Sequence, residues 1–279
     1  MASGEVRPST SSNTPAPSPP PPYRPPSSQT LPILRSLIQS TSFRICSLTR
    51  TLYLPIPHPS LTLSLTLPNP LDFAPLHRTL NDPLVALQLE GPPYPYTEDQ
   101  ARDWIKINTE RYERIVARWI DAGRIGWDEE GCPVGNLRLG EGAGVGGDAD
   151  VKKEEGDVEQ DTVWSYGCAF LSERRLEVGK GFSLQLWVLF LLRTVFLAPQ
   201  YHRQGIMAAA LQCIIESYLI PVLKARHIRS CAFEDNWGSR RTQEKCGMRR
   251  VPDEDHEVDV AESRGGSKKV HVQFEYIPR

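Results

Sequence analysis

The clearest alternation of apolar and polar positions lies at residues 60–68, "SLTLSLTLP". Leu recurs at every second position, with Ser or Thr between. This period of two is typical of a β-strand with one face toward the core, so we expect a half-buried strand that Pro68 ends.

A period of 3.6 marks the segment "TEDQARDWIKINTERYERIVARWIDAG", residues 97–123. Thr97 is a favourable N-cap, the acidic residues that follow it suit the positive end of a helix dipole, and Gly123 suits a C-terminal cap. The pattern predicts one long amphipathic helix. Its apolar face is expected to hold Trp104, Ile107, Ile115 and Trp119.

Shorter patterns predict helices at residues 70–82, 206–220 and 237–247, a buried strand at 227–236, and strands at 248–252 and 268–277 joined by a polar loop. This mixture of strands and helices predicts an α/β (α+β) fold.

Domain organisation follows from composition. Residues 1–30 are rich in Pro and Ser and predict a disordered tail. Residues 31–58 form a lead-in that fits either a short helix or an extended segment. We expect the main domain at residues 59–279, with a flexible acidic loop at 126–161.

Bulk properties exclude several classes of protein. The 279-residue chain has a net charge of −2, which does not suggest a nucleic-acid footprint. The six cysteines are scattered without a CxxC pair, so we expect no metal site. We find no signal peptide, and the most apolar run, residues 184–198, contains Arg193 and is short for a membrane span. A cytoplasmic location is the expectation, a nuclear one remains open, and the oligomeric state is not indicated.

The stretch "APQYHRQGIMAAAL", residues 198–211, carries the strongest chemical signal. It predicts a strand-to-helix turn with a basic residue and a glycine. The first N–H groups of a helix lack internal partners, and glycine allows close approach of the backbone, so such a turn suits a phosphate. The alternative is a plain strand-to-helix turn that binds no ligand, in which Gly205 is present only because a side chain would not fit there.

Three quoted segments together resemble a known family: "LEVG" at 176–179, "VFLAPQYHRQGIMAAAL" at 195–211 and "NWGSRRTQEKCGM" at 236–248. In this order they resemble the GNAT superfamily of acyl-CoA N-acyltransferases, in particular its RimJ/RimL-like branch. The resemblance covers roughly residues 59–279. It implies a mixed, mostly antiparallel central sheet flanked by helices, with acetyl-CoA as co-substrate and no metal.

The resemblance also implies residue roles. Acetyl-CoA is expected to contact Phe196, Leu197, Ala198, His202, Arg203, Gln204, Gly205, Ile206, Met207, Asn236 and Ser239. Glu177 matches the family's acidic position and is the candidate general base, and Ser239 is the candidate donor to the leaving thiolate. For Glu177 the alternative is a surface carboxylate, and for Asn236 a helix N-cap.

The implied activity is acetyl transfer to a primary amine by direct attack in a ternary complex. The acceptor is a protein N-terminus, a lysine or a small amine. The alternative is a degenerate GNAT-like domain that acts as a non-catalytic binding or interaction module. A nucleotide-binding protein is disfavoured, because neither a P-loop nor a dinucleotide-binding glycine motif is present.

The sequence departs from the family pattern at two places. His202 and Met207 stand where the family usually has other residues. Residues 180–194, "KGFSLQLWVLFLLRT", have no counterpart in the family. We interpret this insertion either as a translated intron or as a true insertion that packs as an extra element.

Overall fold

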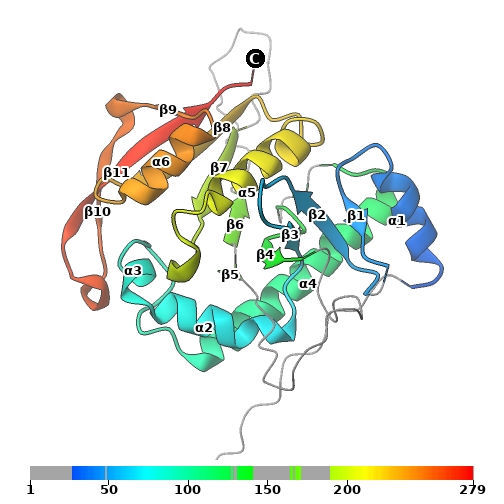
Figure 1. Cartoon of the computed structure of the whole chain (residues 1–279), viewed down its shortest axis with the longest axis horizontal. Coiled ribbons are helices and arrows are strands. Elements are labelled where there is room, and N and C mark those ends of the chain that lie inside the picture. The colour runs from blue at the N-terminus through cyan, green and yellow to red at the C-terminus, as the bar shows by residue number, and fades with distance from the viewer. Residues whose placement is uncertain are drawn as a thin grey trace, which may run out of the picture.

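The computed structural model describes residues 27–47, 49–126, 128, 131–140, 164–165, 167–170 and 189–278 (Figure 1). Its helices are α1 (Thr30–Ile38), α2 (Phe73–Asn81), α3 (Pro83–Ala86), α4 (Glu98–Ala122), α5 (Ile206–Ile214) and α6 (Trp237–Lys245). Glu177 and the first nine residues of the 180–194 insertion lie outside the described residues.

The strands form two hydrogen-bonded sheets. The first has the order β1 (Arg44–Ile45), β2 (Leu52–Ile56), β3 (Leu63–Thr66), β4 (Asn136–Leu139) and β5 (Trp164–Ser165). The second has the order β10 (His256–Asp259), β11 (Lys268–Tyr276), β8 (His227–Phe233), β7 (Leu189–Thr194) and β6 (Gly167–Phe170), with β9 (Arg249–Arg250) on β11.

Within the described strands, β7 and β8 are the only parallel pair. The prediction of a mixed, mostly antiparallel arrangement flanked by helices is therefore confirmed, although the ladders form two sheets rather than one. The last six residues of the proposed insertion are β7 itself, so they occupy a central position between β6 and β8.

The long helix α4 begins and ends as the sequence predicts. Thr97 and Gln100 form a capping box, and Gly123 adopts a left-handed conformation at φ 63°. One expected core residue is wrong: Ile107 is 60% exposed. Ile115 and Trp119 are buried as expected, and the same face also contains Ile105 and Tyr112, which precede Trp119 at intervals of two helical turns.

Three other expectations need correction. The strand β3 is buried at all four residues rather than half-buried, and the Ser64 and Thr66 hydroxyls donate to the carbonyl oxygens of Gly140 and Asn136. The segment 126–161, which was expected to be a loop, contains the strand β4, whose backbone pairs with that of β3. The polar loop expected between the last strands contains β10, which pairs with β11.

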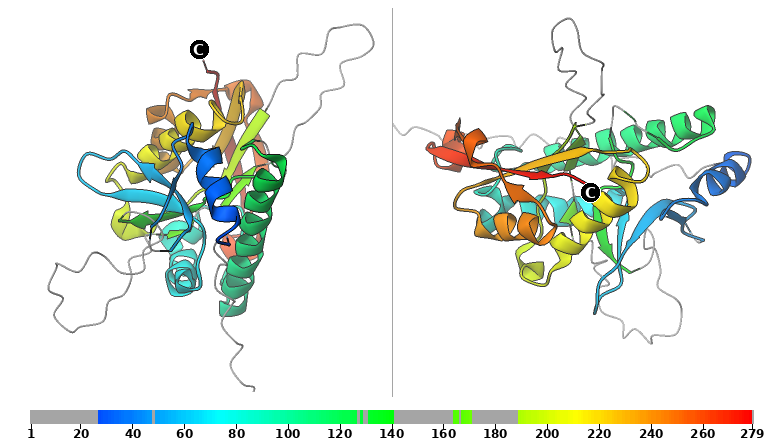
Figure 2. Two further views of the ribbon diagram at one scale, coloured as in Figure 1. Left: turned by 90° about the vertical axis from the view of Figure 1, so that its right-hand side faces the viewer. Right: turned by 90° about the horizontal axis from the view of Figure 1, so that it is seen from above.

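The main core joins both sheets through α4 and α5. Figure 2 shows α4 on the opposite face of the second sheet from α5 and α6. An aromatic cluster links Phe43, Trp119 of α4 and Tyr218 of the π-helix after α5, with ring centroids 5.6–6.3 Å apart. Such contacts add packing energy beyond area burial, so they anchor the C-terminal end of α5.

A second, smaller cluster lies beneath α2 and α3. Phe196, two residues after the end of β7, packs there with Leu76, Val85, Leu89 and Ile105. This contact ties the end of a central strand to the helical layer. Among the described helices, none combines the length and apolarity that a membrane crossing needs.

Candidate functional site

A pocket of about 920 Å³ opens where the parallel strands β7 and β8 part. Their pairing runs from Leu189–His227 to Leu192–Ser230. Beyond Ser230, β8 continues to Phe233 beside β11, whereas the chain of β7 leaves the sheet after Thr194. Val195, Phe196 and Leu197 therefore line one side of the opening and Ser230 the other.

The turn before α5 forms one end of the pocket. Arg203 and Gly205 both have left-handed backbones, at φ 64° and 80°, and this sharp reversal starts the helix at Ile206. The first intrahelical hydrogen bond runs from the Ala209 N–H to the Gly205 carbonyl, at 3.0 Å. The three N–H groups before Ala209 have no acceptor inside the helix, and Ile206, Met207 and Ala208 line the pocket.

Side chains brace this turn. The His202 Nε2 lies 2.7 Å from the Leu197 carbonyl oxygen, and the His58 Nε2 lies 3.1 Å from the Gln204 carbonyl oxygen. The Gln204 side chain donates to the Gln200 carbonyl at 3.0 Å. These contacts hold a conformation that is unfavourable for a non-glycine residue such as Arg203.

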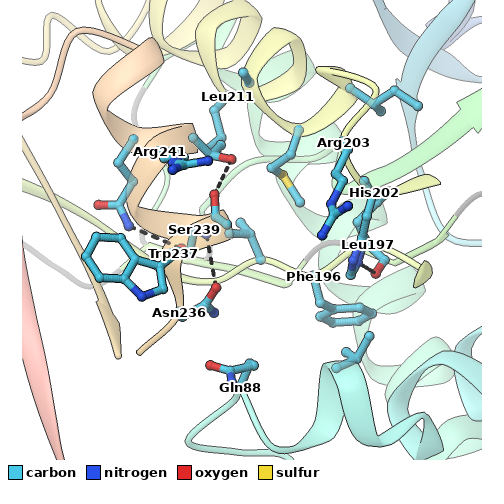
Figure 3. A pocket seen from close by; sticks show the side chains of 18 of the residues that line it. Gln88, Phe196, Leu197, His202, Arg203, Leu211, Asn236, Trp237, Ser239 and Arg241 are labelled. Atoms are coloured by element: carbon cyan, nitrogen blue, oxygen red, sulfur yellow. Dashed lines mark hydrogen bonds between the residues drawn. The ribbon is translucent and has the colours of Figure 1, made fainter. Parts of the chain in front are cut away.

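The N-terminus of α6 forms the facing wall (Figure 3). Asn236 is the N-cap: its Oδ1 accepts from the Ser239 N–H at 3.0 Å. The Ser239 Oγ accepts from the Gln243 Nε2 at 3.3 Å. Trp237 is 61% exposed beneath the Arg240 guanidinium, which lies 4.1 Å from the ring centroid.

The third wall comes from α3 and the residues after it, which contribute Leu84, Val85, Gln88 and Leu89. Arg264, in the loop before β11 and only 4% exposed, holds this wall by donating to the carbonyl oxygens of Ala86, Leu89 and Pro92.

Lys269 reinforces the same wall from β11. Its Nζ lies 3.1 Å from both the Leu87 carbonyl and the Asp235 carboxylate. The β10–β11 hairpin thereby ties α3 to the edge of the pocket.

The lining is chemically asymmetric. Arg203, Arg241 and Lys245 bring positive charge, and among the described lining residues Asp235 is the single carboxylate. Apolar side chains cover much of the remainder. The N-terminus of α5 with Arg203 beside it suits an anionic group, and the apolar part of the lining suits an uncharged arm.

The structure brings together most of the residues that the sequence singles out. Those that line the pocket are Phe196, Leu197, His202, Arg203, Gly205, Ile206, Met207, Asn236 and Ser239. Ala198 and Gln204 lie in the same turn but outside the lining. Within the described residues, no group of His, Cys, Asp or Glu side chains is arranged to hold a metal ion.

Sequence reasoning missed the α3 wall and most of the α6 lining. Arg241, Thr242 and Lys245 follow Gly238 at intervals of three, four and seven residues, which places all four on one face of α6. The helical period of this segment could therefore have predicted that they line the pocket. No sequence pattern predicts that α3 lines the pocket, because Arg264 and Lys269, far along the chain, hold it there.

By sequence, no family model and no curated protein matches the chain. By structure, it is similar to a GNAT-family acetyltransferase from Bacillus anthracis, with 15% identity, 80% of this chain and 98% of that chain covered, and a TM-score of 0.45. It is also similar to RimL, a ribosomal L7/L12 α-N-protein acetyltransferase in complex with coenzyme A, with 13% identity, 80% and 97% coverage and a TM-score of 0.45.

A third similar structure is Mycobacterium smegmatis RimJ in complex with a CoA disulfide, with 12% identity, 81% and 86% coverage and a TM-score of 0.44. These structures come from the family whose motifs the sequence resembles. At such identities and TM-scores, the roles of individual residues have to come from this chain's own geometry.

Proposed function

We propose that the chain is an acetyl-CoA-dependent N-acetyltransferase of the GNAT type, which transfers an acetyl group to a primary amine. One observation carries the proposal: a single pocket joins the opening between two parallel strands to the N-termini of both α5 and α6. An elongated ligand with a pyrophosphate at one end and a thioester at the other fits that arrangement.

In this proposal the phosphates lie at the turn before α5. The N–H groups of Ile206, Met207 and Ala208, which have no acceptor inside the helix, bind the pyrophosphate, and Arg203 adds a charge contact. The backbone of residues 196–198 accompanies the pantetheine arm. The thioester then lies near Asn236 and Ser239 on α6.

The reaction requires a neutral amine, because an ammonium has no lone pair, and a lysine-like amine has a pKa of about 10.4. A general base removes the proton, and Glu177 stays our candidate for it. The nitrogen attacks the carbonyl carbon, and a backbone N–H stabilises the resulting oxyanion. The C–S bond then breaks, and Ser239 donates a proton to the departing sulfur.

The test begins with calorimetric titration of acetyl-CoA into the full chain, followed by thiol release with a panel of N-terminal peptides, lysine peptides and small amines. Micromolar binding with turnover supports the proposal. Binding without turnover on any acceptor, or no binding of acetyl-CoA at all, refutes the enzymatic function and favours the alternative, a non-catalytic binding or interaction module.

Arg203→Ala provides a site-specific check, with Arg50→Ala as its matched control. Both arginines are exposed and have left-handed backbones, at φ 64° and 58°, but Arg50 does not line the pocket. An exposed charge contact contributes up to about 1 kcal/mol, so we expect roughly a fivefold loss of affinity for Arg203→Ala alone. Equal affinities for the two variants would place the phosphates elsewhere.

A further inference from the structure

Gln243 is a buried amide in the wall of the pocket that the proposed chemistry leaves without a role. It lies one helical turn after Ser239 on α6 and is 2% exposed. Its Nε2 is 3.3 Å from the Cys231 carbonyl oxygen of β8 and 3.3 Å from the Ser239 Oγ. Its Oε1 is buried and has no hydrogen-bond partner among the described residues.

The Cys231 carbonyl determines the orientation of the Gln243 amide, that is, which of its two positions holds the nitrogen and which the oxygen. A carbonyl oxygen only accepts hydrogen bonds, so the NH₂ group of Gln243 has to face it. The same NH₂ group then also faces the Ser239 Oγ. Turning the amide over would place Oε1 against the Cys231 oxygen, where neither atom is a donor.

The amide in turn determines the polarity of the serine. Because the Ser239 Oγ accepts from Gln243, its own hydrogen points in another direction. The Ser239 N–H is already committed to Asn236 Oδ1. Within the described part of the chain, the hydroxyl hydrogen has no acceptor, and Ser239 lines the pocket (Figure 3).

We propose that Gln243 is a positioning residue that holds the Ser239 hydroxyl as a hydrogen-bond donor toward the ligand. This inference rests on the proposed acetyl transfer. As the C–S bond breaks, its electron pair passes to sulfur, and Ser239 gives its proton to that sulfur. Ser239 then regains a proton from the acylated nitrogen through solvent, so the net change is one proton moved from nitrogen to sulfur.

The unpartnered Oε1 of Gln243 agrees with this role. Burying an amide oxygen without a partner is unfavourable, whereas Met fills a similar volume without a polar atom. A residue needed only for packing has no use for the amide. The NH₂ group, by contrast, is the part that reaches both Cys231 and Ser239.

The experiment is a double-mutant cycle of Gln243→Met and Ser239→Ala, with calorimetric affinity and kcat measured for each protein. General-acid catalysis contributes about 10²–10⁴ in rate, so we expect Ser239→Ala to lower kcat about a hundredfold. Gln243→Met keeps the Ser239 hydroxyl but removes the hydrogen bond that orients it. We therefore expect a decrease of about tenfold in kcat with unchanged acetyl-CoA affinity. The double variant is expected to equal Ser239→Ala, because Gln243 acts through the serine.

Gln243→Glu tests the hydrogen-bond polarity directly, since the side chain keeps its shape. A carboxyl buried at this position is held protonated, and its single hydrogen is taken by the Cys231 carbonyl oxygen, so the same group faces Ser239 only as an acceptor. The serine hydroxyl then donates to it and turns away from the sulfur, so kcat is expected to approach that of Ser239→Ala. Gln212→Met is the control: Gln212 is an exposed glutamine on α5 outside the pocket, bonded to Glu216. Thermal unfolding of each variant identifies any that fails to fold.

Multiplicative rate losses in the double variant, or normal kcat in both Gln243→Met and Gln243→Glu, overturn the positioning role while leaving acetyl transfer intact. A wild-type chain that neither binds nor turns over acetyl-CoA overturns the proposed function and this inference together. A loss of affinity without a loss of kcat assigns Gln243 to binding instead and also overturns the proposal.

Discussion

Replacing Gly205 by Ala isolates the backbone conformation of the turn before α5. Gly205 has φ 80°, and an added Cβ meets no heavy atom within 4 Å. The stability cost is therefore conformational rather than steric. A left-handed backbone costs a non-glycine residue about 1–2 kcal/mol, which corresponds to a fall in Tm of roughly 2–8 °C for a chain of this size class.

Gly123→Ala is a matched control at the end of α4. Gly123 has φ 63°, its added Cβ also meets nothing within 4 Å, and it does not line the pocket. The two substitutions are expected to destabilise the protein by similar amounts. Only Gly205→Ala alters the turn whose N–H groups are proposed to bind phosphate.

The expected loss of affinity follows from those N–H groups. If the strained turn relaxes, one phosphate hydrogen bond is lost, and a hydrogen bond to a charged group contributes about 1.5–3 kcal/mol. We therefore expect acetyl-CoA to bind roughly 10- to 100-fold more weakly to Gly205→Ala, by calorimetry, and unchanged to Gly123→Ala. Equal affinities in the two variants, with equal losses of Tm, would refute the reasoning.

Two further predictions concern buried groups. Arg264→Met leaves carbonyl oxygens of the α3 wall unpaired, so we expect a loss of about 2–5 kcal/mol and faster hydrogen exchange at residues 83–92 than in the rest of the protein; uniform exchange would contradict a local role. Burial raises the pKa of the Cys132 thiol from its usual value near 9 to about 12. The unfolded thiol therefore ionises first, and stability is retained below about pH 9 and falls at higher pH by up to about 1.4 kcal/mol per pH unit. Urea unfolding of Cys132→Ala between pH 8 and about 10.5 is expected to show a shallower decline, and an unchanged slope would exclude this thiol as a source.

Local patterns in the sequence were sufficient for elements whose signals are short-range. Thr97 and Gly123 set the limits of α4, because capping depends on a few neighbouring residues. Gly205 indicated the turn before α5 in the same way. Asn236 has the N-cap geometry that the sequence left open as an alternative to a ligand contact, and its position in the pocket wall keeps both roles available.

Errors arose where burial depends on distant partners. The period of two at residues 60–68 predicted one exposed face for β3, yet packing covers both faces, and the Ser64 and Thr66 hydroxyls find carbonyl acceptors far along the chain. Ile107 is apolar but points away from the core, since the neighbouring elements contact a different stripe of α4.

The sequence by itself therefore determined the positions of caps, turns and most elements, and the identity of the glycine turn. Only the tertiary structure decided that Arg264 would hold the α3 wall and that the Cys231 carbonyl would orient Gln243 toward Ser239. The physical reason is distance along the chain: the Cys231–Gln243 contact and the Arg264 contacts join residues 12 to 178 positions apart, and no local propensity records which of them will meet.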